Sequence, residues 1–374
     1  MALSNETNGQ GGETTQGTGS DDASGATRHC GCAYQCPPPT YAAGKSTAGK
    51  SRLCSCDAAE ATGVINHELR LSDRENAAAR ASLPELGSRR FAMDDFESQV
   101  AGLCLEYGCR LDRLPDALRH RFVQLGRDAA LNEYLARARR ERHGSFVTRL
   151  HRVLRGYLSD FDINGLLNVY PMHVLGTEQW RYLLDQAPLE QAQGARLLDV
   201  GAGSGDVTHA LAPLFDAVVT TELSRAMAYR LRRRGFACFR QDVAVHGVPE
   251  PPYDAIACLN VLDRCDRPLA LLANLRAGLK DRGLLLLALV LPYNPFVYEG
   301  GSSRDPSEKL PLTHTREWER SALEVCERVI EPLGFEVELI TRAPYLSGGD
   351  AKRPLYELDD VVLVCRARGQ ALLL

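Results

Sequence analysis

A glycine-rich turn is the first feature of this sequence that could do chemistry. The segment DVGAGSGD (199–206) follows a short apolar run and precedes an amphipathic stretch, so the sequence predicts a strand, a turn and a helix. Glycine adopts backbone conformations closed to other residues and lets a ligand approach the main chain. Asp199, Gly201 and Gly203 are therefore candidate ligand-binding residues. The alternative is a glycine turn in a ligand-free core.

An acidic residue, Glu222, closes the second predicted strand. At about 20 residues beyond a glycine turn, a carboxylate can accept hydrogen bonds from both hydroxyls of a ribose. Nicotinamide, flavin and S-adenosylmethionine sites share this pattern. Here the spacing is G-x-G-x-G, and Asp206 stands where a dinucleotide fold would have its last glycine. A carboxylate is unfavourable beside a pyrophosphate but suits a sulfonium and an amino acid. The pattern therefore favours S-adenosylmethionine as the cofactor.

Polar residues follow the fourth predicted strand in the block CLNVLDRCD (258–266). Because ligands bind outside the carboxyl ends of parallel strands, these side chains should face the reacting centre. Asn260 could contact the amino-acid end of the donor, and Asp263 could reach a substrate. Asp266 is explained as a cap of the next helix, whereas Asp263 comes too early for that role.

A segment of little periodicity, from about 292 to 314, follows the fifth predicted strand. Such insertions beyond a sheet edge often form a substrate lid. Tyr345 and Tyr356 are expected in the loop between the last two strands, where aromatic side chains could form the wall of a pocket. Ordinary packing is the alternative for both tyrosines.

Short apolar runs alternate with amphipathic stretches from about residue 195 onward. The strand candidates are 195–200, 216–222, 253–259, 284–291, 335–341 and 360–365, with a short strand near 238–240. The helix candidates are 206–214, 224–234, 267–280 and 315–332. This alternation predicts an α/β fold with a mostly parallel, doubly wound sheet.

Three regions are expected along the chain. Residues 1–92 are rich in Gly, Ser, Thr and Ala and predict a mostly disordered tail. Residues 93–190 predict a helical N-terminal cap without evident chemistry, and residues 191–374 the ligand-binding domain. Two sets of apolar residues in the cap recur at helical spacing: Leu118, Phe122, Leu125 and Ala129, and Phe146, Leu150, Val153, Leu154 and Tyr157.

Cysteines are grouped in the tail at Cys30, Cys32, Cys36, Cys54 and Cys56. Paired thiols could hold zinc, but the C-x-C and C-x3-C spacings are not those of zinc knuckles, so no metal is assigned. The cysteines from Cys238 onward stand singly in apolar segments and are expected to be reduced thiols of an intracellular protein.

The composition excludes some classes of partner. The net charge is −4, and no basic face of the kind that binds nucleic acid is evident. The Arg-rich stretch 137–142 is interpreted as a solvated helix face. No run approaches the roughly 20 apolar residues of a membrane span, and the first residues do not resemble a secretory signal. We therefore expect an intracellular, cytoplasmic protein.

Several segments together resemble the DREV family, also called methyltransferase-like protein nine. The matching segments are DINGLLNVYP (162–171), DVGAGSGDVT (199–208), TELS (221–224), CLNVLDRCDRPLALL (258–272), ALVLPYNPFV (288–297), TRAPYL (341–346) and LDD (358–360). They extend from about 115 to 366, and the LNVLDRCD block is the most specific. The resemblance implies a Rossmann-like class I methyltransferase sheet.

The family methylates the pros (Nδ1) nitrogen of histidine in proteins with His-x-His motifs, in which x is small. By resemblance, Glu222, Asn260 and Tyr345 contact the methyl donor together with the glycine loop, and Asp263 and Tyr356 belong to the histidine pocket. Asn294 departs from the family, which commonly has histidine there.

Methylation of histidine requires the correct tautomer more than a strong base, because imidazole with a pKa of about 6.5 is mostly neutral near pH 7. A carboxylate at Asp263 that accepts the far N–H would select this tautomer and stabilise the developing charge. Two other functions remain open: a methyltransferase of a small metabolite or RNA, and a catalytically silent binding module.

Overall fold

The computed structural model describes residues 100–101, 103, 105, 107–140, 145–154, 160–167, 171–299, 302–349 and 355–369. The cysteine cluster 30–56 and the expected tail 1–92 lie outside these residues. The helices are η2 (Leu111–Arg113), α3 (Asp116–Arg119), α4 (Ala129–Arg140), α5 (Ser145–Leu154), α6 (Asp160–Leu167), α7 (Thr177–Gln186), α8 (Asp206–Leu211), η3 (Ala212–Leu214), α9 (Arg225–Arg233), α10 (Val243–His246), α11 (Pro268–Gly278), α12 (Trp318–Glu324), the π-helical η4 (Val325–Ile330) and η5 (Glu331–Leu333).

The strands form one eight-stranded sheet and a separate two-stranded hairpin. They are β1 (Met172–His173), β2 (Arg196–Val200), β3 (Ala217–Thr221), β4 (Ala237–Phe239), β5 (Tyr253–Leu259), β6 (Leu279–Val290), β7 (Val297–Glu299), β8 (Ser302–Arg304), β9 (Phe335–Gly348) and β10 (Leu355–Ala367). The order in the large sheet is β1-β9-β10-β6-β5-β2-β3-β4. Strands β6, β5, β2, β3 and β4 are parallel, and β10 lies antiparallel between β6 and β9. This arrangement confirms the expected Rossmann-like class I sheet.

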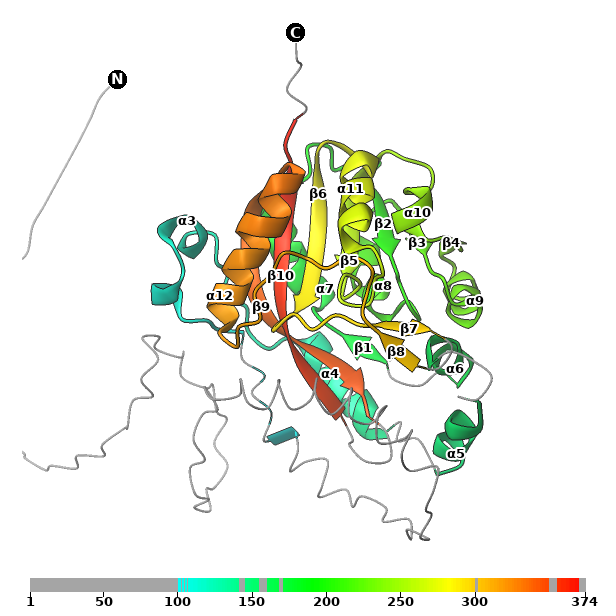
Figure 1. Cartoon of the computed structure of the whole chain (residues 1–374). Helices are drawn as coiled ribbons and strands as arrows, with labels where there is room; N and C mark the ends of the chain where they lie inside the picture. The colour runs from blue at the N-terminus through cyan, green and yellow to red at the C-terminus, as the bar shows by residue number, and fades with distance from the viewer. Residues whose placement is uncertain are drawn as a thin grey trace, which may run out of the picture. The chain divides into compact units, whose positions relative to one another are not determined.

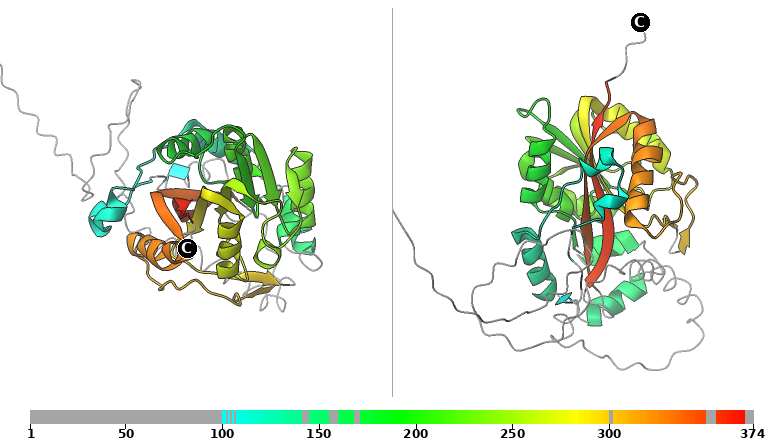
Figure 2. Two further views of the ribbon diagram at one scale, coloured as in Figure 1. Left: turned by 90° about the horizontal axis from the view of Figure 1, so that it is seen from above. Right: turned by 90° about the vertical axis from the view of Figure 1, so that its left-hand side faces the viewer.

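Helices cover both faces of the sheet, as Figures 1 and 2 show. Alternate residues of each central strand enter one of two apolar cores: Leu198 and Leu285 pack with α11 and α12, whereas Leu197 and Leu284 pack with α4 and α7. Because both faces are buried, the strands are continuously apolar rather than alternating with polar residues. This explains why short apolar runs identified the strands in the sequence.

The helix predicted from the spacing of Leu118, Phe122, Leu125 and Ala129 is wrong. Helix α3 ends at Arg119 and α4 begins at Ala129. Between them the backbone pairs with β9: Val123 N donates to Ile340 O over 2.8 Å, and Ile340 N donates to Arg121 O over 3.0 Å. This pairing extends the chain, so tertiary contacts override the local spacing. The second set of apolar residues falls in α5 as expected up to Leu154, and Tyr157 lies outside the described residues.

The last two strands are much longer than the sequence indicates. Strand β9 continues to Gly348, and β10 begins at Leu355, so the two form a long hairpin. Tyr345 and Tyr356 therefore lie on strands and not in a loop, which corrects the sequence prediction. Strand β1 adds to the extended end of β9, where Met172 pairs with Ser347. The cap region thus contributes a strand to the sheet.

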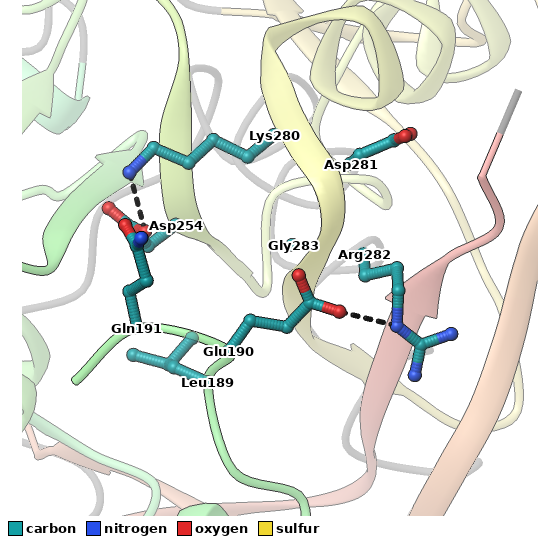
Figure 3. Close-up of a pocket in the computed structure, with 8 residues that line it drawn as sticks. All are labelled: Leu189, Glu190, Gln191, Asp254, Lys280, Asp281, Arg282 and Gly283. Carbon is teal, nitrogen blue, oxygen red and sulfur yellow. Dashed lines mark hydrogen bonds and ion pairs between the residues drawn. The ribbon is translucent and has the colours of Figure 1, made fainter.

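The amino-terminal edge of the sheet carries a mixed-charge cavity of about 240 Å³ (Figure 3). Four of its charged side chains form two ion pairs: Lys280 Nζ lies 2.7 Å from Asp254 Oδ1, and Arg282 Nε lies 2.6 Å from Glu190 Oε1. Ligands of doubly wound sheets bind at the opposite, carboxyl edge. This cavity therefore lies at the edge of the sheet away from the candidate site.

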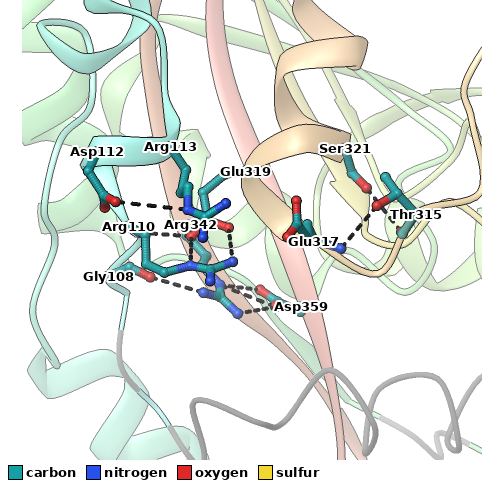
Figure 4. A network of polar contacts seen from close by, with 10 residues as sticks. All are labelled: Gly108, Arg110, Asp112, Arg113, Thr315, Glu317, Glu319, Ser321, Arg342 and Asp359. Carbon is teal, nitrogen blue, oxygen red and sulfur yellow. Dashed lines mark hydrogen bonds and ion pairs between the residues drawn. The ribbon is translucent and has the colours of Figure 1, made fainter. Parts of the chain in front are cut away.

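A polar network fastens the segment before η2 to α12 and the hairpin (Figure 4). Arg342 donates to both carboxylate oxygens of Asp359, with Nε–Oδ1 at 2.9 Å and Nη2–Oδ2 at 2.5 Å, and Nη1 donates to Gly108 O over 3.1 Å. The guanidinium also lies 5.3 Å from the centre of the Trp318 ring. A forked pair of this kind fixes geometry as well as charge.

We expect Arg342→Leu to lower the free energy of unfolding by about 2 to 4 kcal/mol, because it leaves the Asp359 carboxylate without its cation in a partly buried position. Urea denaturation followed by circular dichroism measures this change. Arg113→Leu is the control, since the Arg113 side chain forms an exposed ion pair of 3.9 Å with Asp112. An equal loss in both variants would contradict the role given to Arg342.

Candidate functional site

The glycine turn after β2 adopts a conformation that other residues avoid. Gly201, Gly203 and Gly205 have φ values of +67°, +57° and +84°. A Cβ atom on Gly201 would lie 2.8 Å from Val261 Cγ2, and one on Gly205 would lie 2.9 Å from Leu231 Cδ2. Backbone shape and close packing therefore both require glycine at these two positions. The contact with Val261 also brings the turn against the segment that follows β5.

Asp199 ties the end of β2 to the helix that follows the turn. Its Oδ2 accepts a hydrogen bond from Thr208 Oγ1 over 2.6 Å, and both residues are buried. Burial raises the pKa of Asp199 to about 7, against the opposing effect of the Thr208 hydrogen bond. The Asp199 carboxyl thus links β2 to α8 across the glycine turn, and it also lines a cavity at the carboxyl edge of the sheet.

Glu222 follows β3 and contacts the turn directly. Its Oε2 accepts from Gly203 N over 3.0 Å, and its Oε1 accepts from Ser224 N over 2.8 Å. A carboxylate has about four acceptor positions, so each oxygen can still accept one further hydrogen bond. Burial raises the pKa of Glu222. Ser224 Oγ is in turn 2.5 Å from Asp162 Oδ1 of α6, which connects the cap region to this part of the site.

Asn260 turns the chain sharply at the end of β5. It has a φ of +58°, a region that asparagine tolerates better than most residues. Its backbone N donates to Ala288 O over 2.9 Å, and its Nδ2 donates to Asp360 Oδ2 over 2.8 Å. The amide oxygen Oδ1 is buried and has no hydrogen-bond partner among the described residues.

Asp263 is a buried carboxylate, 3% exposed, beside a single cation. Arg264 Nη1 donates to its Oδ2 over 2.5 Å, whereas Oδ1 is buried without a partner in the described part of the chain. Burial raises the pKa of Asp263, and Arg264 opposes that shift. The guanidinium of Arg264 lies 3.9 Å from the centre of the Phe296 ring, and Phe296 N donates to Asp263 O over 3.0 Å. The segment expected to form a lid is thereby attached to Asp263.

Tyr345 and Tyr356 share one face of the β9–β10 hairpin. Tyr345 lies opposite Leu358, and Tyr356 stands two residues before Leu358, so both point to the same side. Tyr345 Oη donates to Met172 Sδ over 2.8 Å. Burial raises the pKa of Tyr345, and the nearby Asp360 and Asp263 raise it further. Tyr356 is half-buried.

A cavity at the carboxyl edge brings part of the predicted site together. It is lined by Met172, Val174, Asp199, Gly201, Ala202, Val207, Leu259, Asn260 and Tyr345. Gly203 and Glu222 do not line it, but they are hydrogen-bonded to each other at the glycine turn that does. Asp263 and Tyr356 are not among its lining residues, although Asp263 is close enough to influence the pKa of Tyr345.

The sequence analysis missed two contributions to this site. Met172 and Val174 come from the region in which no chemistry was expected, and a Cβ on Gly203 would lie 3.2 Å from Met172 Cε. Apolar side chains before the sheet carry no signal that distinguishes them from ordinary core residues. Asp360 was missed as well, because it follows Glu357 and Asp359 at the start of an apolar run and nothing in the sequence distinguishes it from them.

The site offers mainly hydrogen-bond acceptors. Asn260 Oδ1, Asp263 Oδ1 and Asp360 Oδ1 are all buried without partners among the described residues, and Glu222 can accept further bonds. Buried acceptors fit a ligand that brings donors and positive charge, such as a sulfonium with an ammonium group and ribose hydroxyls. A pyrophosphate would face these carboxyls unfavourably. The residues therefore fit S-adenosylmethionine.

No group of three or more His, Cys, Asp or Glu residues in the described ranges could hold a metal ion. None of the helices that the structure describes combines the length and apolar composition needed to cross a bilayer.

The chain is similar to a known protein family and to curated proteins. The family model described as DREV methyltransferase matches residues 107–367. Ubiquinone biosynthesis O-methyltransferases of Xylella fastidiosa (strain 9a5c) and Xanthomonas campestris pv. campestris (strain B100) are 29% and 30% identical over 127 and 125 residues, 32% of this chain in each case. The chain spans about half the length of these curated relatives, 50% and 51% respectively.

Solved structures were also matched. N-methyltransferase NodS from Bradyrhizobium japonicum WM9, in complex with S-adenosyl-L-homocysteine, is 13% identical with a TM-score of 0.30, covering 51% of this chain and 87% of its own. An S-adenosylmethionine-dependent methyltransferase from Clostridium acetobutylicum ATCC 824 is 12% identical with a TM-score of 0.31, covering 52% and 93%. The fold assignment rests on strand order and direction rather than on these scores.

We expect Gly201→Ala to weaken binding of S-adenosylhomocysteine about tenfold or more, because a left-handed alanine costs about 1 to 2 kcal/mol and its Cβ displaces Val261. Isothermal titration calorimetry measures the affinity. Gly194→Ala is the matched control, since Gly194 has a φ of +72° with nothing within 4 Å of its Cβ position. Weaker binding in the control variant would show that strain alone, and not the turn, affects the ligand.

Proposed function

The chain belongs to the DREV methyltransferase family, and we propose that it transfers the methyl group of S-adenosylmethionine to the pros (Nδ1) nitrogen of histidine in proteins with His-x-His motifs. The observation that carries this proposal is the hydrogen bonding of the two Asp263 carboxylate oxygens. One carboxylate oxygen accepts a hydrogen bond from Arg264, and the other is buried without a hydrogen-bond partner among the described residues. An imidazole N–H is a donor that suits such an acceptor.

The donor side of the site is built from three strand ends. The glycine turn admits a ligand close to its backbone, Glu222 can accept ribose hydroxyls, and Asn260 presents a carbonyl oxygen to an amino group. When bound, S-adenosylmethionine supplies a methyl group activated by a sulfonium. The task of the protein is then to place a nucleophile in line with the carbon–sulfur bond, and orientation alone contributes much of such a rate.

The acceptor side concerns the tautomer of the substrate histidine. With its Nε2–H donated to Asp263, the ring presents the Nδ1 lone pair to the methyl carbon. The N–C bond forms as the C–S bond breaks, which gives S-adenosylhomocysteine and a positively charged ring. The Asp263 carboxylate stabilises this charge, and the Nε2 proton passes to solvent after the product leaves. Tyr356, on the same hairpin face as Tyr345, would form the wall of the histidine pocket.

A second candidate function is methylation of a small molecule. It is supported by the names of the curated relatives, which are ubiquinone biosynthesis O-methyltransferases matched over 32% of this chain. These functions share the donor site and differ only in the pocket. Incubation with labelled donor and separate pools of peptide, RNA and small metabolites distinguishes them. Label confined to the metabolite or RNA pool would replace the protein-histidine proposal.

We expect mass spectrometry of a His-x-His peptide panel to show one methyl group on Nδ1 of a histidine, with rates that fall as x becomes larger. Peptides in which either histidine is replaced by glutamine serve as controls. A methyl group on Nε2, or equal rates for a peptide with a single isolated histidine, would contradict the proposed specificity.

We expect Asp263→Ala and Asp263→Asn to lower kcat on such a peptide by about 100-fold or more, because a preorganised charge that stabilises the transition state is lost. Asp112→Ala changes an exposed carboxylate and should retain the wild-type rate. A near wild-type rate in either Asp263 variant would remove this residue from the chemistry.

The wild-type rate should fall as the pH falls. Burial raises the pKa of Asp263, so its ionised form is lost as the pH falls through that value, and the substrate histidine becomes protonated below about pH 6.5. Both titrations therefore lower the rate as the pH falls. We expect kcat/KM, measured from pH 5 to 8, to decrease only toward the acid side.

A further inference from the structure

Asp360 is a carboxylate for which the fold alone gives no reason. It lies in β10 opposite Val290 of β6 and Ala343 of β9, and the residues after it are apolar. Its side chain is completely buried, with a relative exposure of 0%. A carboxylate in such a position costs stability unless it is fully paired, and an apolar residue of similar size is often tolerated better.

The only hydrogen bond that the structure gives to the Asp360 carboxylate, among the described residues, comes from the candidate donor site. Asn260 Nδ2 donates to Asp360 Oδ2 over 2.8 Å, across 100 residues of sequence, whereas Asp360 Oδ1 has no partner in the described part of the chain. In the ranges that the structure describes, Asp360 forms no ion pair, in contrast to Asp263 with Arg264 and Asp359 with Arg342. Burial accordingly raises the pKa of Asp360 well above its usual value.

This contact decides which end of the Asn260 amide faces the ligand. An amide presents either its NH₂ group or its carbonyl oxygen, depending on its partner. Because Asp360 takes the NH₂ group, Oδ1 is the atom that remains for the cavity that Asn260 lines. A carbonyl oxygen accepts a hydrogen bond from an ammonium, which an NH₂ group cannot do.

We propose that Asp360 is a positioning residue of the donor site, which holds the Asn260 amide with its carbonyl oxygen available to the amino group of S-adenosylmethionine. The inference rests on the donor-binding part of the proposed function and not on the identity of the methyl acceptor. Asp360 acts through Asn260, so its removal should change donor affinity through that residue alone. A structural role would instead change stability and binding together.

The test is a double-mutant cycle with the full chain, in which S-adenosylhomocysteine binding is measured by calorimetry and stability by thermal unfolding. Asp360→Leu should weaken binding about tenfold or more, because the Asn260 NH₂ group is left without its partner. Asp360→Asn retains an acceptor oxygen and should recover most of the affinity. In the Asn260→Ala background, Asp360→Leu should cause no further loss. If Asp360→Leu does not fold, Asp360→Ala takes its place in the cycle.

Asp359→Asn is the matched control, because it changes the neighbouring carboxylate on the opposite strand face, which pairs with Arg342. It should lower the unfolding temperature and leave binding unchanged, whereas Asp360→Leu should weaken binding with little change in unfolding temperature. The inference is overturned if Asp360→Leu binds within about twofold of the wild type, or if its loss adds to that of Asn260→Ala.

The assay also separates this inference from the proposed function. It needs no methyl acceptor, so a wild-type chain that binds S-adenosylhomocysteine but methylates no His-x-His peptide overturns only the proposed substrate. The cycle then still decides the role of Asp360. A wild-type chain that does not bind S-adenosylhomocysteine overturns both.

Discussion

Burial of carboxylates at one edge of the sheet is the physical constraint on which the rest of this structure depends. Asp199 and Glu222 lie at the ends of β2 and β3, Asp263 lies in the segment after β5, and Asp360 of the antiparallel β10 lies opposite the carboxyl end of β6. Burial raises the pKa of each. Charged groups lose their hydration there, and of these four carboxylates only Asp263 forms an ion pair with a residue that the structure describes. The edge is therefore short of positive charge, which a sulfonium ligand would supply.

The elements around this edge bury the carboxylates from solvent. The glycine turn packs on Val261, Met172 approaches Gly203, and the segment with Phe296 covers Arg264. Each of these contacts comes from a different part of the chain: the segment after β5, the cap region and the insertion after β6. The cap region is thus part of the site, since Asp162 bonds to Ser224 and Met172 lines the cavity. Stability and ligand binding are coupled through these shared contacts.

The sequence predicted those parts of the site that depend on local backbone chemistry. Gly201 and Gly203 could be recognised because a left-handed turn after a strand admits few other residues, and Asn260 and Asp263 because they follow a buried strand. Because these residues follow the ends of parallel strands, they could be assigned to one edge of the sheet.

The sequence could not predict contacts set by the pairing of distant segments. The full extent of β9 and β10 comes from their pairing with each other, and β1 adds to β9 from outside the sheet domain, so Tyr345 was expected in a loop. Pairing with a distant segment also explains the wrong helix prediction at Phe122, because the backbone there pairs with Ile340. Met172 and Asp360 lack any local signature, because their role arises only from their neighbours in space.

The long hairpin of β9 and β10 has a consequence for the order in which the chain can assemble. The contacts that complete the cavity join Tyr345 to Met172 and Asn260 to Asp360, 173 and 100 residues apart. Contacts of such separation form late, because the loops between them must first close. During synthesis on the ribosome, the glycine turn and β5 emerge long before β10, so the nascent chain cannot yet hold the ligand. Ligand binding can stabilise this fold only after the final strand has been made.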